Sequence, residues 1–146
     1  MSSTILFPTD YSEASHAALP FATSLARDWG ATLLVVHVSE KENYPVGEVF
    51  DEEAPPPAEE MAKLEMVKPI DEAVHCKHKV LFADPSSETA HPAKEIVKCA
   101  DEEGVDAIVM GSHGRTGLSH LLMGSIADAV LRDAPCPVVT VKQPKK

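Results

Sequence analysis

Short, continuous apolar runs alternate along this chain with segments of helical periodicity, and this alternation limits the possible folds more than any other feature. Continuous apolar runs are typical of parallel strands that are buried on both faces. Strands that alternate with helices imply right-handed crossovers, which place helices on both faces of the sheet. The sequence therefore predicts an α/β fold with a five-stranded parallel sheet. We expect strands at residues 4–7, 31–38, 79–83, 106–110 and 137–141, and helices at residues 10–29, 59–74, 88–103 and 124–132.

The length and composition fit one globular unit. The chain has 146 residues, of which 44% are hydrophobic and 25% are charged, so we expect a single domain over residues 1–146. The longest purely apolar runs, such as residues 33–36, have four residues, far short of the roughly 18 residues of a membrane span. The first residues carry no basic segment of the kind that opens a signal peptide. We therefore expect a cytoplasmic protein with no membrane partner.

The net charge of −10 argues against nucleic-acid binding, which needs a basic surface. The negative charge is concentrated in one stretch. Residues 40–60 contain eight acidic residues and one lysine, a net charge of −7. We interpret residues 39–58 as a mobile, solvated loop and suggest that it forms a flap near one end of the binding site.

A glycine-rich segment follows the fourth expected strand. Gly111, Gly114 and Gly117 lie within seven residues, and Gly124-Ser125 opens the last helix. Glycines allow a ligand to approach the backbone closely, and the free N–H groups of a helix amino terminus bind anions. The segment is neither a Walker A loop nor the dinucleotide fingerprint, because the spacing differs and no lysine is present. It indicates a phosphate site, although a tight strand-to-helix turn would also explain the glycines.

The spacing Gly111-x2-Gly114-x9-Gly124-Ser125 resembles the G-x2-G-x9-G-[ST] motif of the ATP-binding universal stress proteins. Residues 5–12, 34–38, 106–111 and 136–141 also resemble strands and loops of that family. The resemblance covers nearly the whole chain except the acidic stretch. It implies an open, Rossmann-like sheet in the order 3-2-1-4-5. Because strand order reverses between the first and fourth strands, that resemblance places Asp10 beside Gly111, at the point where such sheets bind ligands.

The resemblance also implies a set of nucleotide-binding residues. Adenine would lie against the backbone of Val38, and Asp10 would contact the ribose or a metal ion. The matching loop positions that would hold the ribose and the phosphates are Pro8, Thr9, Met110, Gly111, His113 and Gly114, followed by Gly124, Ser125, Ile126 and Ala127. Arg115 follows the second motif glycine and is a further candidate for the phosphate oxygens.

Each of these assignments has a plainer structural alternative. Asp10 is also a suitable helix cap, as is Ser12, and His113 and Arg115 are also consistent with solvent-facing loop residues. His37, in the second expected strand, is better explained as a core histidine with a hydrogen-bond partner than as a ligand. Ala127 stands where some relatives carry a hydroxyl group, which removes one possible phosphate donor.

The function implied by the resemblance is a homodimeric regulatory or stress-response module that binds ATP with Mg²⁺ or Mn²⁺. The dimer would form through the last strand, from Pro137 to Val141. The main alternative is a slow ATPase or a phosphoryl or nucleotidyl transferase. The loop has no lysine and no evident base, so we expect weak hydrolysis at most. A dimerisation module without a nucleotide and a flavin-binding electron carrier are further alternatives.

Overall fold

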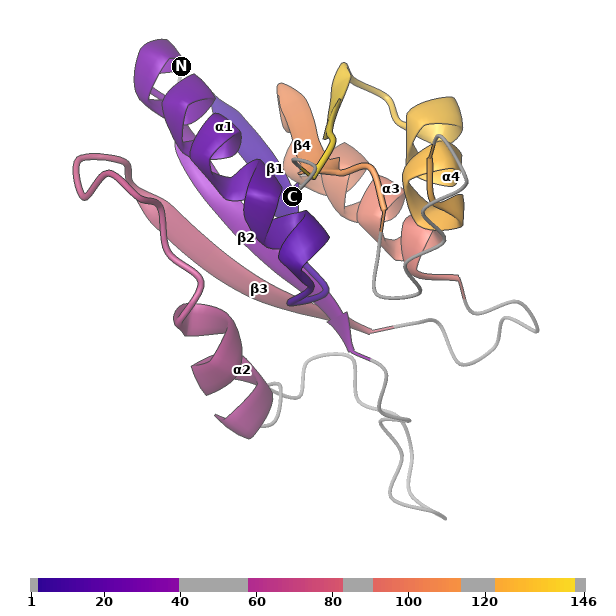
Figure 1. Cartoon of the computed structure of the whole chain (residues 1–146), viewed down its shortest axis with the longest axis horizontal. Coiled ribbons are helices and arrows are strands. Elements are labelled where there is room, and N and C mark those ends of the chain that lie inside the picture. Colours follow the sequence, from indigo (N-terminus) through magenta and orange to yellow (C-terminus); the bar gives the residue numbers. More distant parts are fainter. Residues whose placement is uncertain (1–2, 40–57, 83–90, 114–122, 144–146) are drawn as a thin grey trace.

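The computed structural model describes residues 3–39, 58–82, 91–113 and 123–143. Within these ranges, five parallel strands form one sheet in the order β3-β2-β1-β4-β5 (Figure 1). The strands are β1 (Thr4–Pro8), β2 (Thr32–Ser39), β3 (Cys76–Phe82), β4 (Ala107–Gly111) and β5 (Val138–Val141), and the helices are α1 (Glu13–Trp29), α2 (Ala58–Glu65), α3 (Pro92–Glu103) and α4 (Ser125–Asp133). The predicted α/β class and the strand order implied by the family resemblance are both confirmed.

Two apolar cores cover the two faces of the sheet, because successive strand residues point to opposite sides. Ile5 and Phe7 of β1 belong to a core completed by α1 and α2. Leu6, between them, belongs to a second core completed by α3 and α4. Figure 1 shows these helix pairs on opposite sides of the strands. The central strands are apolar at nearly every position for this reason. None of the helices described by the structure is long and apolar enough to span a membrane.

The connection between α2 and β3 differs from the prediction. The sequence predicted a helix over residues 59–74 that Pro69 interrupts, but α2 ends at Glu65 and does not resume, because Pro69 has no N–H group and cannot continue the helix. The third strand begins at Cys76, three residues before the predicted start at Lys79. β3 lies at the edge of the sheet, so its first half is partly exposed and has a polar sequence.

Other boundaries follow the predicted capping. Ser12 is the N-cap of α1, and the helix runs through Pro20 without a break until Gly30, which adopts a left-handed conformation. Among the described residues, α3 begins at Pro92; its predicted start at residue 88 lies outside them. The predicted acidic loop also falls outside the described residues, except for its two ends, Ser39 and Ala58.

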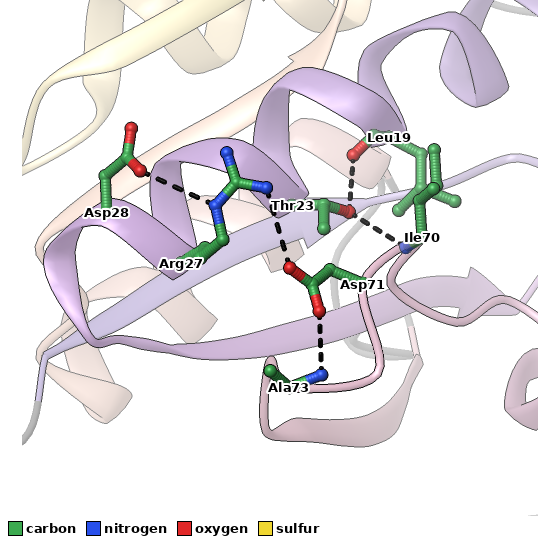
Figure 2. Close-up of polar contacts among 7 residues, drawn as sticks. All are labelled: Leu19, Thr23, Arg27, Asp28, Ile70, Asp71 and Ala73. Carbon is green, nitrogen blue, oxygen red and sulfur yellow. Dashed lines mark hydrogen bonds and ion pairs between the residues drawn. The ribbon is translucent and has the colours of Figure 1, made fainter.

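Two side chains of α1 hold the α2–β3 connection in place (Figure 2). The buried Thr23 hydroxyl donates to the carbonyl of Leu19 (2.8 Å) and accepts from the backbone N–H of Ile70 (3.2 Å). One turn further along the helix, the Arg27 guanidinium lies 3.5 Å from the carboxylate of Asp71. The Thr23 hydroxyl is buried and makes two hydrogen bonds, whereas the Arg27 side chain is half exposed. The threonine therefore contributes more to docking this connection.

Replacing the two α1 residues separately tests this ranking. Thr23→Val keeps the shape of the side chain but leaves the Ile70 N–H unpaired, so we expect a loss of about 1–2 kcal/mol in unfolding free energy. Arg27→Gln removes an exposed ion pair, for which we expect a loss of about 0.5 kcal/mol or less. Urea unfolding of both variants measures the difference. Equal losses would contradict the ranking.

Candidate functional site

The candidate site lies where β1 and β4, which pair side by side, end at the same edge of the sheet (Figure 1). The chain leaves β1 at the buried Pro8 and leaves β4 at Gly111. Strand order reverses between these two strands, so their exits leave a crevice in sheets of this type. The neighbouring β2 contributes its last residues, Val38 and Ser39, at the same edge.

The loop after β1 is fixed by its own side chains. The backbone N–H of Thr9 donates to the carbonyl of Val36 (2.8 Å), and its hydroxyl accepts from the N–H of Tyr11 (3.0 Å). The Asp10 carboxylate accepts from the N–H of Ser12 (3.0 Å), which forms a local turn. Ser12 itself caps α1 by accepting from the N–H of Ser15 (3.1 Å). Asp10 is therefore not the helix cap, and it lies half-buried, two residues after the end of β1.

An aromatic pair, not expected as a unit from the sequence, supports this loop. Tyr11 has a left-handed backbone with φ of 66°, a conformation that costs about 1–2 kcal/mol for a residue with a side chain. Its ring lies against the ring of His37, with centroids 4.5 Å apart. The Nδ1 atom of His37 donates to the carbonyl of Thr9 (2.8 Å). His37 does have a hydrogen-bond partner, as predicted, but it lies half-buried beside the site and outside the core.

Ser112 connects the two halves of the glycine motif. Its N–H donates to the carbonyl of Val141 in β5 (2.9 Å), and its carbonyl accepts from the N–H of Gly124 (2.6 Å). The Ser112 hydroxyl is also 3.1 Å from Nδ1 of His113. These bonds bring Gly124, the N-cap of α4, next to the end of β4. Two of the motif glycines thus lie close together, although thirteen positions separate them.

The amino terminus of α4 has donors to offer. The N-cap residue, Gly124, has no side chain that could accept hydrogen bonds from the first N–H groups of the helix. Ser125 is exposed and Ile126 is half-buried. The side chain of Ala127 is buried in the core on the α3–α4 face. A ligand could therefore contact Ala127 only through its backbone amide.

The other predicted site residues fall into two groups. Pro8 and Met110 are buried at the ends of their strands, and the Val38 side chain packs against the second core, so only their backbone is available to a ligand. Gly114 and Arg115 lie outside the described residues. Among the described residues, no group of three His, Cys, Asp or Glu side chains could hold a metal ion. A metal ion at Asp10 would need phosphate oxygens and water to complete its coordination, which is how Mg²⁺ often binds.

Gly111 has a packing role that the motif alone does not reveal. A Cβ atom at this position would lie 2.7 Å from the carbonyl oxygen of Ala14 and 3.2 Å from Cα of Ser15. Its backbone is not left-handed. The absence of a side chain therefore lets the first turn of α1 approach β4, independently of any ligand.

Comparison with known proteins agrees with this architecture. The sequence model of the universal stress protein family matches residues 1–142. Universal stress protein MJ0531 of Methanocaldococcus jannaschii is 34% identical over 152 residues, covering 97% of this chain and 83% of the relative. The solved structure of MJ0577, from the same organism, superposes with a TM-score of 0.70 at 28% identity and covers 100% of this chain and 99% of that one. A universal stress protein solved in complex with cAMP has a TM-score of 0.67 at 20% identity, with 98% of each chain covered.

Substituting Gly111 tests the close approach of α1 to β4. Because an added methyl group would meet the backbone of α1, we expect Gly111→Ala to lower the unfolding free energy by about 3 kcal/mol. Gly104→Ala is the control, since a methyl group added there would have open space around it, although the backbone has a left-handed φ of 60°. We expect the control to lose about 1 kcal/mol. Denaturant unfolding distinguishes the two, and a near-neutral Gly111→Ala would contradict the proposed packing.

Proposed function

The chain belongs to the universal stress protein family, and we propose that it is an ATP-binding regulatory module that acts as a homodimer. The observation that carries the proposal is the hydrogen bond from the Gly124 N–H to the Ser112 carbonyl (2.6 Å). It holds the start of α4 beside the end of β4, where a phosphate chain could contact both. Binding of cAMP by a protein of the same fold supports a nucleotide as the ligand.

In this proposal the phosphates bind mainly to backbone amides. The uncapped N–H groups at the start of α4 and the exposed Ser125 hydroxyl would donate to phosphate oxygens. Gly114 and Arg115 would complete this part of the site. His113, held next to the buried Ser112 hydroxyl, would contact the nucleotide from the β4 side.

Asp10 would coordinate Mg²⁺ or Mn²⁺ together with the phosphates, or contact the ribose. Its turn with the Ser12 N–H fixes the direction of the carboxylate. One carboxylate plus phosphate oxygens is a common Mg²⁺ arrangement. Pro8 and Thr9 would line the site through their backbone, and the base would lie against the backbone of Val38 at the end of β2.

Titration calorimetry with ATP, after bound nucleotide has been removed, tests the proposal. We expect saturable binding that is at least tenfold tighter with Mg²⁺ than without it, which corresponds to about 1.4 kcal/mol. Asp10→Asn keeps an oxygen acceptor for the Ser12 N–H but removes the charge. We therefore expect the variant to bind ATP equally with and without Mg²⁺. Absence of ATP binding by the folded wild type would overturn the proposal.

The dimer proposal rests on the open edge of β5. The carbonyls of Pro137 and Val141 accept from the N–H groups of Ile108 in β4 and of Ser112, directly after β4 (both 2.9 Å). Peptide groups alternate along a strand, so those of Val138 and Thr140 point away from β4. The side chains of β5 are all half-buried. An open, apolar edge strand is prone to pair with another strand, and we propose antiparallel pairing of residues 137–141 with the same residues of a second chain.

Thr140→Pro tests this pairing. Proline removes an N–H group that points to the open edge and leaves the ladder to β4 in place. We expect the variant to sediment as a monomer under conditions in which the wild type is a dimer. Thr140→Val, which keeps the N–H and the strand propensity, is the matched control and should remain dimeric. A dimeric proline variant would exclude pairing through this edge.

A further inference from the structure

A carboxylate beside the end of β2 has an unused oxygen. The Oε1 atom of Glu60 accepts a hydrogen bond from the Ser39 hydroxyl (2.5 Å). Its Oε2 atom is buried and has no hydrogen-bond partner. Among the described residues, no other buried side-chain nitrogen or oxygen lacks a partner in this way. Burial of an unpaired carboxylate oxygen is costly, so a hydrogen-bond donor brought to Oε2 by a ligand would relieve that cost.

The carboxylate belongs to a cluster at the edge of the sheet where the site lies. Glu60 is in the first turn of α2, and Ser39 is the last residue of β2, directly after Val38. Burial raises the pKa of the Tyr11 hydroxyl, and the negative charge of Glu60 raises it further. The geometry agrees, because the ammonium of Lys63, one turn along α2 from Glu60, lies 4.3 Å from the centroid of the Tyr11 ring. Residues of β2, α2 and the β1–α1 loop thus meet beside the Glu60 carboxylate.

The described neighbours of Glu60 do not supply the missing donor. The Ser39 hydroxyl hydrogen is directed to Oε1. The Lys63 ammonium, one turn along α2, lies over the Tyr11 ring, 4.3 Å from its centroid. No ion pair to Glu60 is present in the described part of the chain.

We propose that Glu60 selects the base of the bound nucleotide by accepting a hydrogen bond at Oε2 from the amino group of a 6-aminopurine. This inference rests on the proposed function, in which the base lies against Val38, next to Ser39. Adenine carries a donor at position 6, whereas hypoxanthine carries a carbonyl oxygen there. A carboxylate attracts the amino group of adenine and repels the carbonyl oxygen of hypoxanthine. A site that provides a buried partner for one group strongly rejects an analogue that lacks it.

Competing titrations with ATP and inosine triphosphate test the selection. We expect the nucleotide-free wild type to bind ATP at least tenfold more tightly. In Glu60→Gln, the amide oxygen can keep the bond from Ser39, and the amide NH₂ then faces position 6 as a donor. We expect the preference for ATP to disappear or to reverse. Glu59→Gln removes the same charge from an exposed neighbour on the same helical turn and should keep the wild-type ratio.

The outcomes separate this inference from the function on which it rests. If the wild type binds ATP but Glu60→Gln keeps its preference, or if the wild type binds both nucleotides equally, the role of Glu60 is wrong and ATP binding stands. If the folded wild type binds neither nucleotide, the proposed function itself fails. Should Glu60→Gln not fold, as judged by circular dichroism, Ser39→Ala replaces it. That variant removes the hydrogen bond that holds the Glu60 carboxylate, so we expect a smaller preference for ATP over inosine triphosphate. An unchanged preference would overturn the inference.

Discussion

The approach of the α1 backbone to Gly111 is the contact on which the geometry of this site depends. A Cβ atom at Gly111 would lie only 2.7 Å from the carbonyl oxygen of Ala14, so the first turn of α1 is held against β4 too closely for a side chain at that position. This packing determines where the chain must turn after β1. The loop accommodates it with a serine cap, an aspartate turn and a left-handed Tyr11. Asp10 thus lies in a loop that leads directly into the part of α1 packed against Gly111.

The two sides of the site are stabilised by different interactions. On the β4 side, backbone hydrogen bonds of Ser112 to β5 and to Gly124 fix the start of α4, and the N-cap Gly124 provides no side-chain cap. On the β2 side, side chains from three segments meet. The Tyr11 ring packs at a tilt against the His37 ring and lies under the Lys63 ammonium, while the Ser39 hydroxyl donates to Glu60. A backbone scaffold is rigid and independent of side-chain identity. The side-chain cluster can change with the sequence and still leave the sheet intact.

Sequence patterns predicted the order of the elements because the central strands are buried on both faces and therefore apolar almost throughout. The same reasoning missed the start of β3, where an edge strand is half exposed and Cys76 to His78 look like a loop. Residues of the site were harder to interpret. Nothing in the sequence indicates that Tyr11 adopts a positive φ, which is uncommon for a residue with a side chain. The motif identified Gly111, but its packing role is visible only in the folded chain. Ala127 matched a phosphate-binding position, yet its side chain belongs to the core.

The chemistry of the proposed site has a consequence for specificity. Amides at a helix amino terminus recognise charge and phosphate geometry, and they contact no part of the base. The buried side chain of Ala127 adds no hydroxyl, so the phosphate end depends even more on the backbone and on Ser125. Such a site would hold any nucleoside triphosphate with similar strength. Discrimination among bases must therefore come from the opposite end, beside Val38, where buried side-chain polar groups are available. Glu60 has a buried acceptor without a partner beside the end of β2. In the proposed site, where the phosphate donors would be mostly amides, this carboxylate would be the group that distinguishes one purine from another.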